Sequence, residues 1–105
     1  MDIDAMRKAA AQAGAMLRTL GNEDRLLLLC RLSQGEMAVS ELAQALDIRQ
    51  PTLSQQLGVL REEGLVSTRR AGKQIYYAVA DAKALALLHT LYQLYCPQPE
   101  NRDDH

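Results

Sequence analysis

Residues 40–79 decide the fold, and they read SELAQALDIRQPTLSQQLGVLREEGLVSTRRAGKQIYYAV. Residues 40–46 predict a short helix, and residues 47–50 predict the turn that follows it. A second helix is predicted to begin at Pro51, because proline suits the first turn of a helix, and to end near Gly64. Two short helices joined by a tight turn form a helix-turn-helix, whose second helix enters the major groove of DNA.

A basic hairpin is predicted directly after these two helices. The runs 65–70 and 74–79 read as short strands, and Ala71-Gly72-Lys73 separates them. Glycine adopts positive φ easily, so a tight turn is favoured at this point. The layout is that of a winged helix-turn-helix, in which the hairpin is the wing.

The rest of the chain predicts three more helices. Apolar residues recur at helical spacing over residues 3–20, and further helices are expected over 23–33 and 82–96. Three side chains are predicted to cap helix starts by accepting backbone N–H bonds: Asn22, Ser40 and Asp81. The predicted fold is therefore mainly α, with four helices, a two-stranded antiparallel hairpin and a fifth helix.

Composition bounds the class of protein. The chain has 105 residues and is 48% apolar, but it lacks Trp and Phe, so its core must be aliphatic with some tyrosine. No apolar run approaches the ~18 residues that span a bilayer, and the Ala-rich start lacks the core of a signal peptide. We expect a soluble cytoplasmic protein with one domain over 1–97 and a polar tail over 98–105.

Charge is distributed unevenly along the chain. The net charge is −1, which by itself argues against a nucleic-acid partner. Residues 49–74 nevertheless contain five basic and two acidic side chains, a net of +3, while the remaining seven basic and eleven acidic side chains give −4. The local charge is what a phosphate backbone senses, so this distribution favours DNA, although charge alone also fits an ordinary solvated surface.

The second helix of the helix-turn-helix has polar side chains near its start. Leu53, Leu57 and Leu60 share one face and must pack inward. Glutamine can pair bidentately with adenine, hydroxyl groups can contact bases or phosphates, and basic side chains suit phosphates or the minor groove. Each is also an ordinary solvated residue when taken alone. The predicted DNA-binding residues are Arg49, Gln50, Thr52, Ser54, Gln55, Arg69, Arg70 and Lys73.

The last helix predicts an assembly. Apolar side chains cover most of the circumference of residues 82–96, whereas a surface helix of a monomer needs only one apolar stripe. We infer a homodimer through this helix and the first helix, an arrangement that suits palindromic DNA. The alternative is a helix buried entirely in its own core.

Four stretches resemble the ArsR family of small dimeric bacterial repressors: GNEDRL at 21–26, QPTLSQQL at 50–57, LREEGLV at 60–66 and RRAGKQIYY at 69–77. The resemblance extends over about residues 15–96 and implies a homodimer that binds operator DNA. Arg49 departs from it, because the family commonly has a small hydroxyl residue there. That change weakens a helix cap and adds a possible phosphate contact.

Cys30 and Cys96 are the only thiols. Metal-sensing relatives have a Cys-x-Cys pair in the third helix, where this chain reads ELAQAL, and Asp81 and His89 lack the rest of a four-ligand set. We therefore expect no metal site and no cofactor. The two cysteines instead resemble the sulfide- and persulfide-responsive BigR/SqrR branch of the family, with one thiol after an apolar run in the second helix and one near the end of the last.

This second resemblance implies a redox switch. Reduced protein would bind DNA, and a persulfide or related sulfur species would link Cys30 to Cys96 through a disulfide or polysulfide, releasing the operator of sulfide-detoxification genes. A link between the second and fifth helices would shift one against the other. Taken without the resemblance, the residues also fit two inert thiols, because free cysteine is commonly buried and a helix C-terminus raises a thiol pKa.

Other functions remain as alternatives. A metal-responsive or general oxidant-responsive regulator would use the same fold. A winged-helix protein-interaction module would lack DNA binding, but the basic wing and the polar helix start argue against it. An enzyme is not expected, because Cys-x-x-Cys, phosphate-binding glycine loops and paired carboxylate motifs are missing from the sequence.

Overall fold

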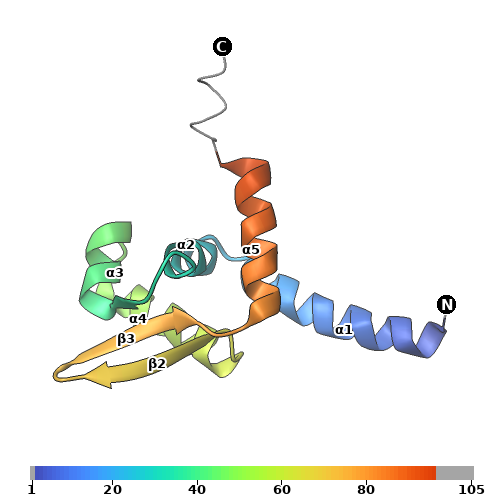
Figure 1. The fold of residues 1–105 in the computed structure, drawn as a ribbon, viewed down its shortest axis with the longest axis horizontal. Helices are drawn as coiled ribbons and strands as arrows, with labels where there is room; N and C mark the ends of the chain where they lie inside the picture. Colours follow the sequence, from blue (N-terminus) through green and yellow to red (C-terminus); the bar gives the residue numbers. More distant parts are fainter. Residues whose placement is uncertain (1, 97–105) are drawn as a thin grey trace, which may run out of the picture.

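Eight helices and strands make up residues 2–96, the part of the chain that this computed structural model describes (Figure 1). In chain order they are α1 (Ile3–Leu20), α2 (Glu23–Leu32), β1 (Met37–Ala38), α3 (Val39–Leu46), α4 (Gln50–Glu62), β2 (Val66–Ala71), β3 (Gln74–Val79) and α5 (Ala82–Tyr95). The predicted order of four helices, a hairpin and a fifth helix is confirmed, so the fold is a winged helix-turn-helix.

The sequence does not predict β1. Its residues Met37 and Ala38 pair antiparallel with Tyr77 and Tyr76 of β3. The sheet order is therefore β1-β3-β2, with β3 in the centre. A strand of two residues is too short to show the alternation of apolar and polar side chains that identifies strands in a sequence.

The start of α3 also differs from the prediction. Its N-cap is Ala38, and the helix begins at Val39, so Ser40 already lies in the first turn. The Ala38 N–H donates to Glu41 Oε1 at 2.8 Å. The predicted Ser40 cap is wrong, because β1 leads directly into the helix and leaves no extended residue at position 40.

The predicted caps of α2 and α5 are confirmed. Asn22 Oδ1 accepts from the Arg25 N–H at 3.1 Å, and Asp81 Oδ1 accepts from the Ala84 N–H at 2.9 Å. Such caps stabilise a helix start by about 1 kcal/mol. They define where the two helices that carry the cysteines begin.

The core between the helices and the sheet is built from leucine. The largest fully buried side chains are Leu28, Leu29, Leu42, Leu53, Leu57, Leu60 and Leu88. They come from α2, α3, α4 and α5, so one cluster joins the helix-turn-helix to the helix on either side of it. The prediction of an aliphatic core is confirmed.

Two helices, α1 and α5, project from this core in different directions (Figure 1). Only Thr19 and Leu20 of α1 are buried. Leu17 of α1 is 60% exposed, and Leu94 and Tyr95 at the end of α5 are 70% and 81% exposed. Burying apolar surface lowers the free energy by about 25 cal/mol per Å², so covering these side chains with a partner would be favourable.

Within residues 2–96, no helix combines the length and the apolar character needed to cross a membrane. The predicted tail over 98–105 and the predicted domain boundary after Pro97 lie outside the described residues.

Candidate DNA-reading surface and cysteine pockets

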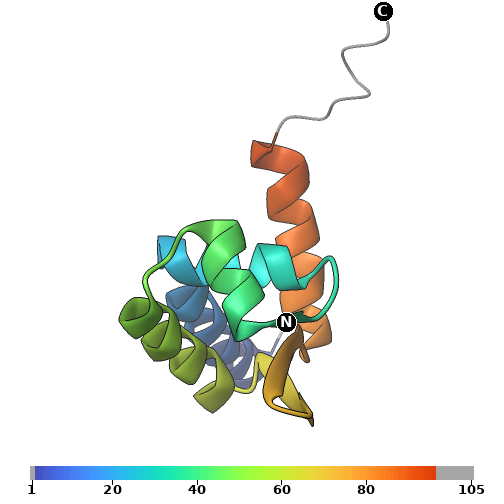
Figure 2. The same cartoon turned by 90° about the vertical axis from the view of Figure 1, so that its left-hand side faces the viewer.

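The start of α4 carries the predicted base-reading side chains. Leu53, Leu57 and Leu60 are buried and hold α4 against the core, as predicted. The polar side chains near the start are exposed, except for the half-buried Thr52: Gln50, Thr52, Ser54 and Gln55. In Figure 2, α4 and the β2–β3 hairpin lie at the same lower edge of the molecule. Together with Arg49 and the wing residues Arg69, Arg70 and Lys73, they make up the candidate DNA-reading surface, here called the reading surface.

The turn before α4 is held by backbone conformation and by one apolar anchor. Asp47 ends α3 with φ 54° and ψ 45°, a left-handed conformation that aspartate tolerates. Ile48 packs against the core. Arg49 is the N-cap of α4, and it makes no side-chain cap bond, so its exposed guanidinium is available for a phosphate.

The wing turns at Gly72, whose φ of 63° favours glycine. Ala71 pairs with Gln74, so Gly72 and Lys73 are the two residues of the turn. Lys73 and Arg70 are both exposed. They are the wing cations that face solvent without an ion pair in the described structure.

Arg69 differs from these two cations. Its guanidinium forms a two-pronged ion pair with Glu36, in which Nε lies 3.1 Å from both carboxylate oxygens, and it also stacks 4.8 Å from the centroid of the Tyr76 ring. Hydrogen bonding to Arg69 lowers the pKa of Glu36, and Glu36 raises the pKa of Arg69. Arg69 must leave Glu36 before it can pair fully with a phosphate.

Arg25 makes a set of contacts that sequence reasoning misses. Its Nε donates to the Thr19 carbonyl at 2.7 Å and its Nη2 donates to the Arg18 carbonyl at 3.3 Å, while Nη1 donates to Gln56 Oε1 at 3.0 Å. One side chain thus joins the end of α1 to the middle of α4. Two of its partners are backbone oxygens and the third is 31 positions away in sequence, so no local pattern signals it.

The structure brings the two cysteines together. Cys30 lies near the end of α2 and Cys96 is the C-cap of α5, where its N–H donates to the Tyr92 carbonyl at 2.9 Å. Both line one pocket of about 380 Å³, here called the Cys30–Cys96 pocket, and both are thiols rather than a disulfide. Its other lining residues are mostly apolar: Glu23, Leu26, Leu27, Leu91, Tyr92 and Tyr95.

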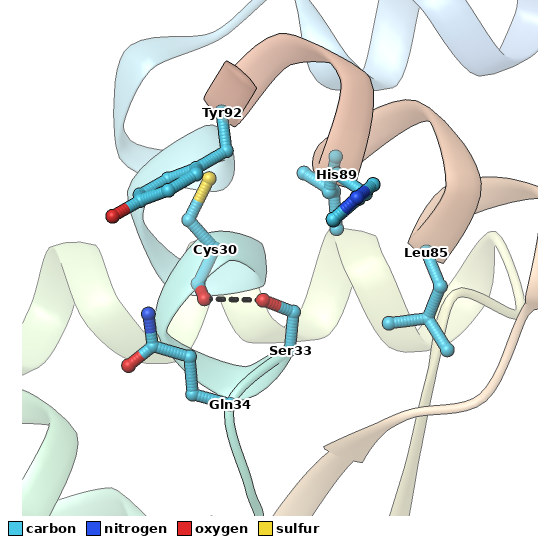
Figure 3. Close-up of a pocket in the computed structure, with 7 residues that line it drawn as sticks. Cys30, Ser33, Gln34, Leu85, His89 and Tyr92 are labelled. Atoms are coloured by element: carbon cyan, nitrogen blue, oxygen red, sulfur yellow. Dashed lines mark hydrogen bonds between the residues drawn. The ribbon is translucent and has the colours of Figure 1, made fainter. Parts of the chain in front are cut away.

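Cys30 also borders a second, more polar pocket of about 480 Å³, here called the His89 pocket (Figure 3). Ser33 and Gln34 line it from the end of α2, and Leu85, Leu88, His89 and Tyr92 line it from α5. The Ser33 hydroxyl donates to the Cys30 carbonyl at 2.6 Å. Cys30 therefore stands between two pockets of different character.

The Cys30 thiol is not activated by its surroundings. Burial raises the pKa of Cys30 above its ordinary value, and the nearby Cys96 raises it further. The influence of Cys96 places the two thiols within electrostatic reach of each other. A raised pKa leaves little thiolate at neutral pH, as expected for a thiol in an apolar helix run.

Possible metal ligands are scattered in the described part of the chain. No group of three or more His, Cys, Asp or Glu side chains within residues 2–96 could hold a metal ion. Asp81 caps α5, while His89 lies in the His89 pocket two turns further on. His105 lies outside the described residues.

Comparisons with known proteins agree with this fold. Residues 22–68 match the family model described as bacterial regulatory protein, arsR family. The chain is 54% identical to a biofilm growth-associated repressor of Agrobacterium fabrum over 99 residues, which cover 94% of this chain and 85% of that protein.

Two solved structures extend the comparison. The transcriptional repressor BigR from Xylella fastidiosa matches with a TM-score of 0.85 and 50% identity, covering 93% of this chain and all of BigR. Reduced HlyU from Vibrio cholerae matches with a TM-score of 0.87 and 37% identity, covering 90% of this chain and all of HlyU. These relatives are regulators, which confirms the prediction of a non-enzymatic protein. The chain belongs to the ArsR family of bacterial regulatory proteins and is a transcriptional regulator similar to BigR.

Proposed function

We propose that this protein is a homodimeric repressor that binds palindromic operator DNA when its thiols are reduced. It releases the DNA when reaction with a persulfide links Cys30 to Cys96 through a disulfide or polysulfide. The observation that carries the proposal is the pocket that both cysteines line, between α2 and α5. The genes released from repression would be those that remove sulfide. BigR is described as a transcriptional repressor, and the matched HlyU structure is described as reduced, which supports this class of function.

DNA binding is assigned to the reading surface. The exposed amide and hydroxyl groups at the start of α4 suit base edges. The exposed cations Arg49, Arg70 and Lys73 suit phosphates. A wing with exposed cations beside a recognition helix supports DNA binding over a protein-interaction role.

Dimerisation is assigned to α1 and α5. Both project from the core with large apolar side chains exposed, which a monomer would leave in water. A two-fold dimer places two copies of α4 on one face of the duplex, one helical turn of DNA apart. The separation between the two reading helices then depends on how α5 and α1 are held against the rest of the subunit.

The link can form with balanced chemistry. The Cys30 thiolate first attacks the terminal sulfur of a persulfide, R–S–SH, and becomes Cys30–S–SH, while the donor S–S bond breaks and R–S⁻ leaves with the electron pair. The Cys96 thiolate then attacks the Cys30 sulfur, and HS⁻ leaves with the electron pair, so that two thiols are oxidised to a disulfide and the sulfane sulfur is reduced to sulfide. Addition of a further sulfane sulfur before closure gives a trisulfide. The Cys30–Cys96 pocket, at about 380 Å³, exceeds the ~30 Å³ of one water molecule many times and has room for the extra sulfur.

Such a link would act on DNA binding through α2. Cys30 lies on α2, which packs directly against α4, and Arg25 of α2 bonds to Gln56 of α4. A covalent bond from α2 to the end of α5 would change the angle between the dimer helix and the recognition helix. The two copies of α4 in the dimer would then no longer match the spacing of the DNA half-sites.

The test measures operator binding and intact mass on the same samples. Persulfide treatment is expected to release DNA in parallel with a change in intact mass that corresponds to a link between Cys30 and Cys96. Cys30→Ser and Cys96→Ser proteins should bind DNA and fail to release it, while Thr90→Ala, an exposed change on α5 outside both pockets, should behave as wild type. Release from Cys30→Ser protein would overturn the proposal.

A parallel arm with hydrogen peroxide separates a persulfide switch from a general oxidant switch. Closure by peroxide removes two hydrogens and adds no sulfur, whereas a polysulfide link adds sulfur atoms to the mass. Equal release by both reagents would favour the oxidant-responsive alternative, whether or not sulfur is added, because the persulfide route can also end in a plain disulfide.

A further inference from the structure

Cys30 lines both of these pockets, whereas Cys96 lines the apolar one of the two. We propose that the His89 pocket is the binding site for the sulfur donor, that the donor is an anionic low-molecular-weight organic persulfide, R–S–SH, and that Cys30 receives its sulfur before Cys96 reacts. This inference rests on the proposed persulfide function and adds the donor site to it.

Polar groups that could hold the organic part of such a donor surround the His89 pocket. Arg31 Nη1 donates to Gln34 Oε1 at 3.3 Å, so the Gln34 amide NH₂ is left as a donor toward a ligand. The Ser33 hydroxyl uses its hydrogen on the Cys30 carbonyl and therefore presents acceptor lone pairs. Figure 3 shows these two side chains on the α2 side and His89 and Tyr92 on the α5 side, and all four line the His89 pocket.

Within residues 2–96, the lining of the His89 pocket contains no Asp, Glu, Lys or Arg side chain, so an anion meets hydrogen-bond donors there without repulsion from a carboxylate. No carboxylate lines the His89 pocket, whereas Glu23 lines the Cys30–Cys96 pocket. Hydrogen bonds from neutral donors to an ionised ligand are stronger than bonds between neutral partners. The Gln34 amide, the His89 ring and the Tyr92 hydroxyl can therefore receive the carboxylate of a peptide-like persulfide, or the thiolate that leaves it.

Size and access fit a small organic molecule. The volume of about 480 Å³ lies within the ~300–1,000 Å³ typical of small-molecule sites. Ser33, Gln34 and His89 are all exposed, so a donor can reach them from solvent. Of the two helices assigned to the dimer, α5 lines this pocket and α1 does not.

The sulfur transfer is balanced as written. The Cys30 thiolate attacks the terminal sulfur of R–S–SH, the S–S bond breaks, and R–S⁻ leaves with the electron pair and takes a proton from water. Cys30 becomes Cys30–S–SH, and no external oxidant is consumed. Cys30 and Cys96 both line the apolar pocket, so the Cys96 thiolate can then attack the Cys30 sulfur of this persulfide.

The experiment isolates this first step in full-length Cys96→Ser protein, in which Cys30 is the only thiol. The rate of Cys30 persulfidation is followed by intact mass with two donors, glutathione persulfide and inorganic tetrasulfide, which lacks an organic part. Gln34→Leu and His89→Leu are each expected to lower the rate with glutathione persulfide about tenfold, the loss of one hydrogen bond to a charged group. Their rates with tetrasulfide should stay within about twofold of the parent, since no organic part is held.

The matched control is Gln44→Leu, an exposed change of the same type on α3 that touches neither pocket, and it should alter neither rate. Parent-like rates with glutathione persulfide in both pocket variants would overturn the donor site, and so would equal slowing with both donors. Circular dichroism establishes that each variant is folded. Failure of the switch itself is read separately, as the absence of a Cys30–Cys96 link in wild-type protein treated with tetrasulfide.

Discussion

The reading surface and the two cysteine pockets are built in opposite ways. The reading surface comes from the single stretch 49–73, and its side chains work because they are exposed and mostly polar or basic. The pockets form where α2 meets α5, and burial there raises the pKa of the Cys30 thiol. One region can therefore be altered by a local substitution without the other, unless the change reaches the core that supports both.

Two contacts connect the regions outside that core. Arg25 of α2 bonds to Gln56 of α4, and Glu36, four residues beyond the end of α2, bonds to Arg69 of the wing. A movement of α2 would reach the recognition helix through the first contact and the wing through the second. Substitutions in the core, in either region and in these contacts should therefore have effects of different size.

The largest effect should come from the shared core. Leu53→Ala removes a fully buried side chain of α4 and should lower the free energy of unfolding by about 2–5 kcal/mol, because it leaves a cavity. Urea denaturation at fixed protein concentration measures this loss. Ser54→Ala, at the exposed neighbouring position, should change it by less than about 0.5 kcal/mol. Equal stability of the two variants would contradict the role of Leu53 in the core.

A smaller effect should be confined to the reading surface. Gln55→Ala should weaken binding to the specific operator by about 1–3 kcal/mol, the value of a good base contact. Alkylation of Cys30 by iodoacetamide should proceed at the wild-type rate, because Gln55 lies on α4, away from both pockets. Fluorescence anisotropy with labelled DNA is the measurement, and Gln44→Ala on α3 is the control. Unchanged affinity in Gln55→Ala would remove this residue from the reading surface.

The reactivity of Cys30 should depend on pH in a way that reflects its burial and its closeness to Cys96. Because burial and Cys96 raise the pKa of Cys30, its thiolate is scarce at neutral pH and becomes more abundant as pH rises. The rate of alkylation should increase about tenfold per pH unit and continue to rise beyond the ~8.5 of an ordinary cysteine. In Cys96→Ser protein one of the two causes is gone, so the profile should move to lower pH. A rate that levels off below that ordinary value would contradict the raised pKa.

The smallest effect should come from the contact between the regions. Glu36→Gln removes the ion pair and frees Arg69 for a phosphate, so the slope of log affinity against log salt should steepen by about one. The pKa of Glu36 is lowered, so the pair persists at mildly acidic pH and is lost only as pH falls through that lowered value. Salt titrations in the Arg69→Ala background are the control. A Glu36→Gln effect that survives there would show that Arg69 does not carry it.

Local patterns in the sequence predict the buried face of α4 and two helix caps. The buried face of Leu53, Leu57 and Leu60 follows from helical spacing, and it fixes which polar residues are left outside. The caps by Asn22 and Asp81 follow from residue type and position. Each of these signals lies within a few residues of its effect.

Other features depend on residues that are distant in sequence. The state of Arg69 depends on Glu36, which is 33 positions earlier, so its charge looks available in the sequence and is paired in the structure. The His89 pocket combines Ser33 and Gln34 with α5, and no periodicity links them. The meeting of Cys30 and Cys96 was expected from a family resemblance and not from spacing.

The Arg25 guanidinium has a geometric consequence for DNA recognition. It donates hydrogen bonds to two carbonyls at the end of α1 and to the amide oxygen of Gln56, so one rigid planar group fixes the position of α1 relative to α4. In a dimer joined through α1, this group in each subunit would help to set the distance between the two copies of α4. A lysine at this position would keep the charge but lack the planar group that holds all three acceptors in fixed positions.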